Sequence, residues 1–455
     1  MDLPDKDNIQ SIENALFIEH NVQRIITQQK INGVYFNSSR ARFYIYVLKE
    51  KQLRLYQSIR PLLSLEVEQP YGVPVRKPFK ADGSYSSQVA KWYDTENIPD
   101  IGGQFTRVQF VEPDLGKRNK LIAQLLRQGW NPRSFTEKGS PKLTVDGEPC
   151  PSLLRIDGEV GKSIAEWYTY RHRESQITGL LKHVREDGRI PADAITIGTP
   201  TYRFRHKIVV NIPKAVKQVL FGREMRSLFR AENYKTHRFV GHDASGLELR
   251  ILAHYINDSD YTREVTSGDI HTKNQRDSGV PTRDDAKTFI YAFIYGAGDA
   301  KIGSIVGGSR LVGKRIKQKF LTSNPRLAKV IADSKRAAKR GYLIGLDGRK
   351  INLRRDRVTG LIQDHKALNT LLQAGGATVM KWAMVILDLW VQDANPNIKK
   401  VIDMHDEGQA EVPLESISQY RFLAEESIRQ AGRLLDLNCP LDAESKVGLN
   451  WAHTH

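Results

Sequence analysis

The chain has 455 residues, 40% of them hydrophobic and 27% charged, so it can form two or three domains with sizeable cores. Its formal charge of +17 calls for a polyanionic partner, and nucleic acid is the first candidate. Two cysteines exclude a disulfide framework and a multi-cysteine metal site, and they fit a reducing cytoplasm. No apolar run approaches the roughly 18 residues of a membrane span, and the polar N-terminal segment is unlike a signal peptide.

The first 190 or so residues carry mainly helical patterns. Apolar positions at helical spacing predict helices over 14–30, 37–59, 117–129 and 164–185. Between them, prolines and glycines interrupt a polar and basic stretch over 66–106. We expect a loop-rich insertion there, and the pattern leaves open whether it is a solvated connector or a functional surface.

The segment Thr201–Pro213 reads TYRFRHKIVVNIP, in which basic and β-branched residues alternate. This alternation predicts an extended segment with Arg203, Arg205 and His206 on one side. Such a side could contact a phosphate backbone. A basic surface strand without a ligand explains the same pattern equally well.

The stretch GHDASGLELR, from Gly241 to Arg250, places an acidic residue between a strand and a helix. The apolar run before it predicts a strand that leads to Asp243, and a helical pattern starts at Leu247. This geometry holds a carboxylate rigidly at a strand end, where a metal or phosphate can bind. Alone, an aspartate in this place is more often a helix cap than a ligand.

A second stretch, RDDAKTFIYAFIYGAG, predicts a helix that starts after Pro281-Thr282. Arg283, Lys287, Tyr291 and Tyr295 recur every four residues, so each lies about 40° further around the helix than the last. A solvated surface face is the ordinary explanation of such a stripe. The tyrosines and small residues of this segment make a solvated surface face a less suitable explanation here. Two cations one turn apart suit the binding of a polyphosphate.

The C-terminal third adds further elements. Residues 314–338 predict a basic helix, and Asp347-Gly348 has the chemistry of a hairpin turn. A helix over 366–391 would carry Asn369 and Gln373 on one face. These two amides could be buried and satisfied within the core.

A last stretch, Lys399–Val412, reads KKVIDMHDEGQAEV and predicts a hairpin with His405-Asp406-Glu407 near its tip. Turns attract acidic residues for conformational reasons alone. Together with Asp243, however, Asp406 gives the minimum protein ligand set for two Mg²⁺ ions, which prefer a few carboxylates, water and substrate phosphate. With Arg283 and Lys287 to neutralise a triphosphate, these pieces predict nucleotidyl transfer.

These three stretches resemble motifs A, B and C of family A DNA polymerases, and the chain looks most like the replicative enzymes of short-tailed bacteriophages. SGDIHTKNQ, GLDGRK, ALNTLLQ, QKINGVYFN and GWNPRSFTEKGSPKL extend the likeness over most of the chain. The resemblance implies an α+β right-hand fold with a helical thumb, an antiparallel-sheet palm and helical fingers. It assigns 1–195 to the thumb, 196–255 and 361–455 to the palm, and 256–360 to the fingers.

The resemblance also implies roles for individual residues. Asp243 and Asp406 would bind two Mg²⁺ ions, helped by the backbone carbonyl of Ala244. Arg283 and Lys287 would hold the triphosphate near His271, with Lys287 as the general acid for pyrophosphate departure. Glu407 would tune the metal site rather than bind to it.

Further roles concern the nucleotide and the DNA. Glu248 would crowd the sugar 2′ position, Tyr291 would stand at its 3′ side, and Tyr295 would stack near the templating base. The residues expected to read the minor groove or hold the primer end are Arg203, His365, Asn369, Gln373 and His405. The implied function is template-directed DNA synthesis from deoxynucleoside triphosphates.

The chain departs from the family pattern at several places. Tyr202 stands where the family usually shows glycine in a Thr-Gly-Arg sequence. His242, Asp403 and Gly408 stand where apolar residues are usual, and residues 353–364 are an insertion. None of these changes touches the expected metal ligands.

Related phage enzymes carry an N-terminal exonuclease domain, whereas only about 240 residues precede Asp243 here. We therefore expect no intrinsic 3′ to 5′ proofreading and a separately encoded exonuclease subunit. The insertion over 66–106 could bind a thioredoxin-like processivity factor, contact duplex DNA, or do neither. The alternative functions are a polymerase that tolerates ribonucleotides and a catalytically inactive DNA-binding subunit.

Overall fold

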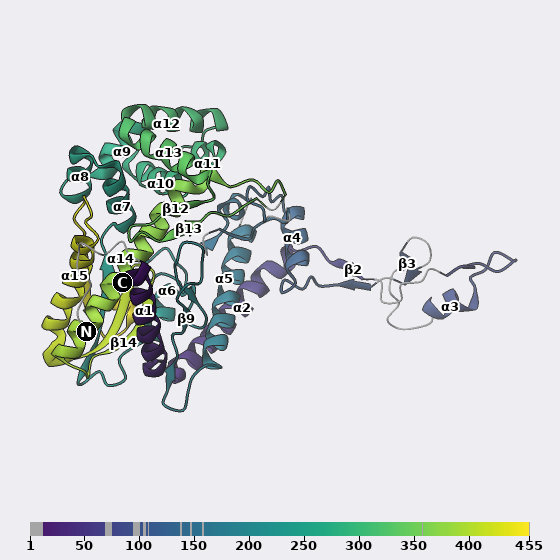
Figure 1. Ribbon diagram of the computed structural model, residues 1–455. Helices are drawn as coiled ribbons and strands as arrows, with labels where there is room; N and C mark the ends of the chain where they lie inside the picture. Colours follow the sequence, from purple (N-terminus) through teal and green to yellow (C-terminus); the bar gives the residue numbers. More distant parts are fainter. Residues whose placement is uncertain are drawn as a thin grey trace. The chain divides into compact units, whose positions relative to one another are not determined.

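The computed structural model describes residues 12–68, 75–93, 101–102, 106–107, 109–136, 139–145, 148–156, 159–356 and 358–454. Helices predominate, and a small antiparallel sheet lies among them, so the predicted α+β class is confirmed (Figure 1). The chain forms two compact units. The first comprises Met1–Ala41, Gly179–Val216 and Gly222–His455, and the second comprises Arg42–Thr178 and Lys217–Phe221.

A four-stranded antiparallel sheet forms the centre of the first unit. Its strands, in spatial order, are β14 (Lys399–Met404), β15 (Glu407–Pro413), β11 (His237–Ala244) and β16 (Ala443–Gly448). The predicted strand before Asp243 and the predicted hairpin over 399–412 are therefore both present, as neighbours in one sheet. The cross-strand register pairs Asp243 with Glu407.

Helix α14 (Ala367–Ala394) is the core helix of this unit, and α15 (Ile417–Leu434) packs beside it. Its side chains are buried almost all the way round, which explains its nearly continuous apolar sequence. Within the described residues, one helical segment, 364–394, is long and apolar enough to cross a membrane. Because 78% of its apolar 18-residue stretch is buried inside the fold, this segment serves as a core helix. It is more apolar than expected from the sequence.

The other elements of the first unit are mostly helices. They are α1 (Ile12–Asn32), α6 (Gly222–Ser227), α7 (Leu247–Ile256), α8 (Ser259–Thr266), α9 (Ile270–Ser278), α10 (Arg283–Ile294), α11 (Asp299–Ile305), α12 (Arg310–Ser323) and α13 (Pro325–Ala338). The segment 314–338 is helical as predicted but forms parts of two helices, because the chain breaks at Asn324 before Pro325 starts α13. Short 3₁₀ turns are η4 (Asp364–Lys366), η5 (Leu414–Ser416) and η6 (Trp451–His453).

Three two-stranded pairs complete this unit. They join β1 (Val34–Tyr35) to β8 (Arg189–Ile190), β9 (Ala194–Ile195) to β10 (Arg205–His206), and β12 (Tyr342–Ile344) to β13 (Lys350–Asn352). The last pair is the hairpin predicted around Asp347-Gly348. The extended segment predicted over 201–213 is wrong for most of its length, because only Arg205 and His206 form a strand. Adjacent strand residues face opposite sides, so Arg205 and His206 do not share a face.

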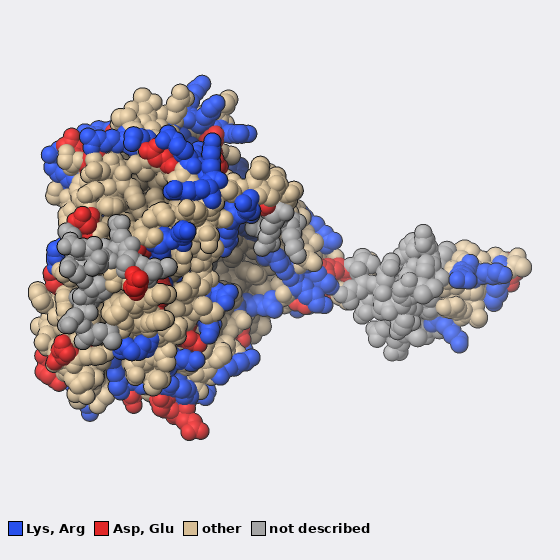
Figure 2. All heavy atoms as spheres, in the orientation of Figure 1, with Lys and Arg blue, Asp and Glu red and all other residues tan. Residues whose placement is uncertain are grey.

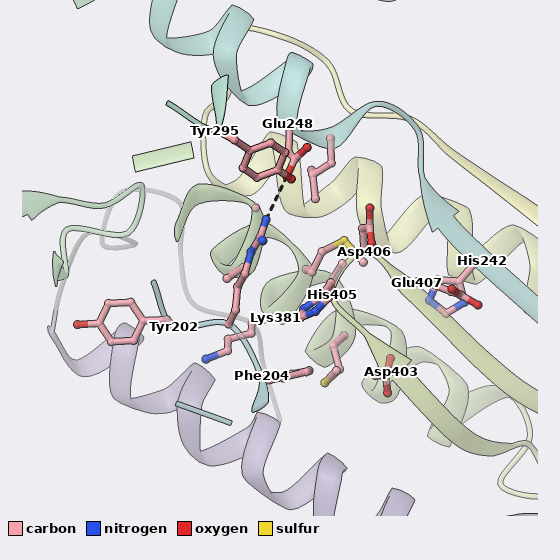
Figure 3. Close-up of a pocket in the computed structure, with 17 residues that line it drawn as sticks. Tyr202, Phe204, His242, Glu248, Tyr295, Lys381, Asp403, His405, Asp406 and Glu407 are labelled. Carbon is pink, nitrogen blue, oxygen red and sulfur yellow. Dashed lines mark hydrogen bonds and ion pairs between the residues drawn. The ribbon is translucent and has the colours of Figure 1, made fainter. Parts of the chain in front are cut away.

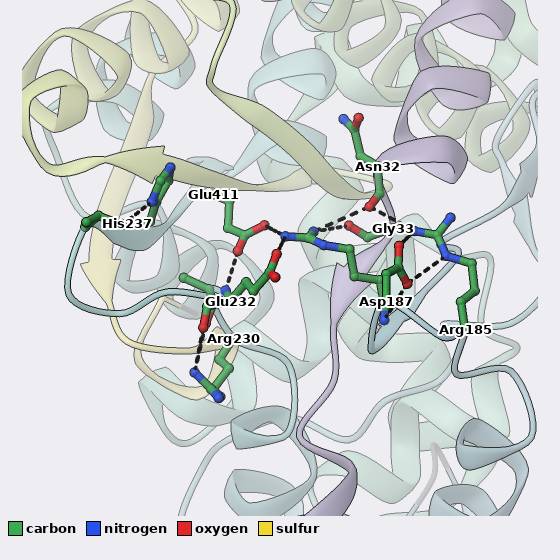
Figure 4. Close-up of polar contacts among 11 residues, drawn as sticks. Asn32, Gly33, Arg185, Asp187, Arg230, Glu232, His237 and Glu411 are labelled. Atoms are coloured by element: carbon green, nitrogen blue, oxygen red, sulfur yellow. Dashed lines mark hydrogen bonds and ion pairs between the residues drawn. The ribbon is translucent and has the colours of Figure 1, made fainter.

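A buried arginine fixes the end of α1 (Figure 4). Arg189 is 5% exposed and donates to the carbonyl of Gly33 at 2.9 Å and to the carboxylates of Glu232 at 2.9 Å and Glu411 at 2.5 Å. Arg185 donates to the last carbonyls of α1, which have no partner within the helix. These contacts tie the C-terminal end of α1 to β8 and β15.

The second unit contains most of α2 (Ser38–Ile59) and α5 (Val160–Leu181), which both continue into the first unit. Its other elements are η2 (Arg60–Leu62), α3 (Ser87–Tyr93), α4 (Arg118–Arg127), η3 (Pro151–Arg155), and the strand pairs β2 (Glu66–Glu68) with β5 (Gln109–Val111), β3 (Ile101–Gly102) with β4 (Thr106–Arg107), and β6 (Thr144–Val145) with β7 (Glu148–Pro149). Its core includes Leu121, Leu125, Trp130 and Ile164. Part of the predicted insertion over 66–106 lies outside the described residues.

Candidate active site

Two carboxylates lie at the same end of neighbouring strands. Asp243 is the penultimate residue of β11, and Asp406 lies in the turn between β14 and β15. The backbone N–H of Ala244 donates to the carbonyl oxygen of Asp406 at 3.1 Å, which ties the two segments together. Both aspartates are exposed to solvent. They meet because three antiparallel strands place residues 163 positions apart side by side.

The local backbone keeps both aspartates at the edge of the sheet. His405 adopts a left-handed φ of 52°, which lets the hairpin turn tightly before Asp406. After β11, Gly246 has a φ of 59° and starts α7. Arg250 donates from Nε to the carbonyl of Ser245 at 2.8 Å and so braces this strand-to-helix turn.

Negative charge is concentrated around Asp406. Solvent reaches this side chain, but the surrounding protein crowds it, and this partial burial raises the pKa of its carboxyl group; Glu248 and Glu407 act in the same direction. A cation placed beside Asp406 would relieve that repulsion. Among the described residues no three His, Cys, Asp or Glu side chains form a cluster suited to a metal ion. The site offers two exposed aspartates at neighbouring strand ends.

A cavity of about 190 Å³ lies beside Asp406, and Glu248 and Tyr295 are among the residues that line it. Figure 3 shows Glu248 and Tyr295 together above the labelled His405 and Asp406. Arg203 donates from NH2 to Glu248 Oε1 at 3.2 Å, and the Tyr295 hydroxyl donates to the same oxygen. Burial and the Glu248 carboxylate raise the pKa of Tyr295 to about 12, so its hydroxyl remains a donor.

Helix α10 carries the cationic stripe. Thr282 caps its first turn in a capping box with Asp285, as Pro281-Thr282 indicated. Arg283 is exposed and forms a two-pronged pair with Asp269, from Nε to Oδ2 at 2.8 Å and from NH2 to Oδ1 at 3.1 Å. Lys287 is exposed one turn later.

His271 and Tyr291 stand next to these cations. The two rings have centroids 6.4 Å apart. The pKa of His271 is lowered by burial and by the charges of Arg283 and Lys287. The pKa of Tyr291 is raised by burial and by the charges of Glu248 and Asp406. The phosphate-side and sugar-side residues expected from the sequence are thus brought together.

The residues expected to contact DNA are only partly gathered. Arg203, Gln373 and His405 line a second cavity of about 390 Å³. Gln373 donates from Nε2 to Asn369 Oδ1 at 2.9 Å, so Asn369 supports Gln373 from one turn away on α14. His365 is exposed on η4, and neither it nor Asn369 is among the residues that line this cavity.

A family model described as DNA polymerase family A matches residues 122–453, which is more than half of the chain. The chain belongs to the family A DNA polymerases. The family and enzyme class predicted from the sequence are thereby confirmed. Family A polymerases use divalent metal ions for catalysis.

Relatives from phages and bacteria agree with this assignment. The DNA-directed DNA polymerase of Escherichia phage Phieco32 is 31% identical over 610 aligned positions, covering 96% of this chain and 98% of the relative. Those of Enterobacteria phage T3 and Escherichia phage T7 are each 34% identical over 78% of this chain, which spans 54% of their length. The polymerase domain of Pol1 from M. smegmatis, solved with DNA primer-template and dNTP, superposes with a TM-score of 0.73, covering 96% of this chain and 70% of that one. At 20% identity, this match shows the fold alone.

Basic residues cover the outer helices of this polymerase. Figure 2 shows many Lys and Arg side chains over the helices at the top of the view, where Figure 1 labels α12. The exposed basic residues of α12 and α13 include Arg310, Lys314, Arg315, Lys319, Lys329, Lys335 and Arg336. The basic sequence of residues 314–338 is consistent with either a solvated face or contact with a DNA backbone, and both remain predictions.

Two histidines and a long-range ion pair position the site, and the ion pair could not be predicted from the sequence. The ring of His206 lies 5.4 Å from that of His405, edge to face, so His206 packs against the residue that precedes Asp406 in the hairpin turn. Lys381 of α14 lines the 190 Å³ cavity and donates to Glu19 of α1 at 2.7 Å. Because residues 19 and 381 are far apart in the chain, no local pattern predicts this ion pair.

Proposed function

We propose that this polymerase adds deoxynucleotides to a primer 3′ end on a DNA template by two-metal nucleotidyl transfer. One observation carries the proposal: the hydrogen bond from Ala244 N to Asp406 O brings two exposed carboxylates together beside the cavity that contains Glu248. Nucleotidyl transfer needs little covalent chemistry from the protein, so positioning and charge provide most of the catalysis.

Asp243, Asp406 and the carbonyl of Ala244 would hold two Mg²⁺ ions. The donor set fits, because it is made of oxygens, leaves positions for water and phosphate, and has the excess negative charge noted around Asp406. When bound, the pair of ions would activate the primer hydroxyl and stabilise the leaving oxygen. Glu407 adds negative charge near the ions and supports the turn.

The cations of α10 would receive the triphosphate. Arg283 is held by Asp269 in this structure, so it must exchange this carboxylate for phosphate oxygens as the nucleotide arrives. Lys287, one turn on, would donate a proton to the departing pyrophosphate. His271 would assist at the phosphates as a neutral hydrogen-bonding group, because both cations disfavour its protonation.

The sugar and the base would lie near the cavity lined by Glu248 and Tyr295. Glu248, fixed by Arg203 and Tyr295, would fill the space of a ribose 2′ hydroxyl. Tyr291 would face the sugar 3′ position, and Tyr295 would stack near the templating base. This arrangement explains selection for deoxynucleotides without any contact that reads the base sequence.

The duplex would follow the second cavity. Arg203, Gln373 and His405 line it and would contact the primer end or the minor groove, checking base-pair shape. Asn369 would act through Gln373, and His365 would contact DNA outside the cavity. The large positive charge would add salt-sensitive binding to the phosphate backbone.

The division of the chain is also proposed. The thumb would span 1–195, the palm 196–255 and 361–455, and the fingers 256–360. We place the enzyme in the replication of a phage genome in the host bacterial cytoplasm. A thioredoxin-like processivity factor bound at 66–106 and a separate exonuclease subunit would be its partners.

The metal-ligand assignment is tested with Asp243→Ala and Asp406→Ala in primer extension with Mg²⁺. Each variant should lose extension while it retains primer-template affinity in fluorescence anisotropy, because the DNA contacts lie on other residues. Asp260→Ala is the matched control, since this aspartate lies on the exposed face of α8 with 73% of its side chain accessible. Substantial synthesis by either active-site variant would refute the mechanism.

The proposal that this chain does not proofread needs a separate assay. Purified enzyme is incubated with Mg²⁺ and a primer whose 3′ end is mismatched, without nucleotides. We expect the primer to stay at full length. Removal of the mismatched nucleotide would contradict the proposal that the chain has no exonuclease activity, whatever the outcome of the extension assay.

A further inference from the structure

Tyr202 adopts a backbone conformation that is unusual for its residue type. Its φ is 58°, in the left-handed region where glycine is common and where a bulky residue is strained. It occupies the place of the glycine in the Thr-Gly-Arg sequence noted above. A strained backbone conformation of this kind persists only when contacts with the surrounding structure hold the residue in it.

Two contacts hold the side chain of Tyr202. Its hydroxyl donates to the carbonyl of Lys350 at 2.6 Å. The guanidinium of Arg349 lies 4.8 Å from the centre of its ring, a cation–π contact. Both partners belong to the hairpin of β12 and β13, so Tyr202 fastens its own loop to that hairpin.

The Arg349 side chain that lies against the ring of Tyr202 is itself held in place. Arg349 is paired with the fully buried carboxylate of Asp347, from Nε to Oδ2 at 2.7 Å, and it also contacts Glu19. Lys381, with 2% of its side chain exposed, donates to the same Glu19 at 2.7 Å. These pairs link the hairpin to α1 and α14, and a buried network of this kind fixes its members in one arrangement.

On the other side of Tyr202, the backbone leads directly into the active site. The N–H of Tyr202 donates to the carbonyl of Thr199 at 3.0 Å, and the N–H of Arg203 donates to Thr199 Oγ1 at 3.1 Å. The Arg203 guanidinium then reaches Glu248, which also accepts from Tyr295. In Figure 3, Tyr202 points away from the cavity while Glu248 and Tyr295 lie at it.

We propose that Tyr202 is a positioning residue that sets the sugar selectivity of this polymerase. By fastening the Thr199–Arg203 turn to the β12–β13 hairpin, it fixes the Arg203 guanidinium on Glu248 and so holds the Glu248 carboxylate where a 2′ hydroxyl would lie. This inference rests on the proposed role of Glu248 as the sugar gate, the residue that would exclude a ribose 2′ hydroxyl. Tyr202 itself touches neither nucleotide nor metal.

The test compares kcat/KM for a deoxynucleotide and the matching ribonucleotide in single-nucleotide extension. Tyr202→Phe removes the hydroxyl and keeps the ring on Arg349, whereas Tyr202→Gly removes both contacts and relieves the left-handed strain. We expect selectivity to fall about threefold in the first and up to about tenfold in the second, the size of one or two lost polar contacts. The thermal midpoint of each variant is measured alongside.

Tyr342→Phe is the matched control, because Tyr342 lies on β12 of the same hairpin and stacks with Arg340 and Lys350. It should keep the wild-type selectivity. The same Tyr202 substitutions are also made in a Glu248→Ala background. There the ratio should no longer respond, because the carboxylate that Arg203 holds is gone.

Unchanged selectivity in both Tyr202 variants would overturn the proposal, and so would an effect that persists in the Glu248→Ala background. Loss of selectivity that follows the thermal midpoint equally in Tyr342→Phe would show a merely structural role and also overturn it. If the wild type extends a primer with either nucleotide at the same rate, the sugar-gate function fails first. That outcome is separate from a failure of Tyr202 alone.

Discussion

His242 on β11 and Gly408 on β15 are cross-strand partners, and the histidine ring fills the space that a side chain at position 408 would need. A Cβ atom built on Gly408 would lie 2.3 Å from His242 Cε1 and 3.1 Å from Asp403 Oδ1. Asp403 is the partner of Gly408 on the other side, in β14. The three unusual residues noted in the sequence are therefore one packing arrangement directly behind Asp243 and Asp406.

Gly408→Val should destabilise the fold by about 1 to 3 kcal/mol, because the added side chain collides with a buried ring in a close-packed sheet. The free energy of unfolding in urea measures this loss. His242→Val should recover most of it in the double variant, since the smaller residue frees the space. Equal destabilisation in the single and double variants would contradict the complementarity.

Asp403 should make the stability depend on pH. Burial raises its pKa from 3.8 to about 6, while nearby Lys400, with Nζ 3.7 Å from Asp403 Oδ2, acts in the opposite direction. Between these two pKa values the folded chain binds more protons than the unfolded chain, so this group's contribution to stability falls as pH rises through that window and is constant above about pH 6.

Asp403→Asn removes this titration. The free energy of unfolding of the variant minus that of wild type should be larger at pH 7.5 than at pH 4.5. The increase should be a few kcal/mol at most, roughly the linkage energy of two pKa units. Urea unfolding at both pH values measures the difference. Asp393→Asn, an exposed position on α14, is the control and should show no such pH dependence. A constant difference between Asp403→Asn and wild type would refute the shifted pKa.

If Arg283 has the proposed role, Asp269 would compete with the triphosphate for its guanidinium. Asp269→Ser keeps an oxygen acceptor for the N-terminus of α9 but removes the charge that holds the guanidinium. The KM for deoxynucleotides should therefore fall modestly, and the fall should shrink at high salt because this exposed pair is screened. Steady-state primer extension at two salt concentrations measures it.

Asp258→Ser is the matched control for this change. Asp258 caps α8 in the same way, accepting from the N–H groups of Asp260 and Tyr261, and it does not contact Arg283. Its substitution should leave KM unchanged. A raised KM in Asp269→Ser would mean that the carboxylate orients Arg283 for the nucleotide and does not compete with it.

Tyr291→Phe should reduce the use of dideoxynucleotides about tenfold relative to deoxynucleotides, because the Tyr291 hydroxyl would replace the missing 3′ hydroxyl of the substrate. The ratio of the two incorporation rates is measured on the same primer. Tyr255→Phe, at a partly buried tyrosine of α7 whose hydroxyl is enclosed, controls for the loss of a hydroxyl in the core. If Tyr291→Phe leaves the ratio unchanged, the assigned position of Tyr291 is wrong.

Local sequence determined the elements that carry the site. The apolar run before Asp243, the capping signal at Pro281-Thr282 and the hairpin around Asp406 are written in short stretches, and each formed as predicted. Two predictions differed from the structure for local reasons. The segment 314–338 is divided into two helices because Pro325 starts a new one. The segment 201–213 alternates like a strand but pairs over only two residues, because it has no long partner strand.

Tertiary structure alone decided how these elements support one another. Three contacts each join residues at least 45 positions apart. They are the hydrogen bond between Ala244 and Asp406, the ion pair of Arg203 with Glu248 and the cation–π contact of Arg349 with Tyr202. The sequence therefore determined which chemical groups this polymerase carries and on which elements. Which of them touch was decided by strand register and by buried ion pairs, because contacts between distant segments leave no periodic pattern in the chain.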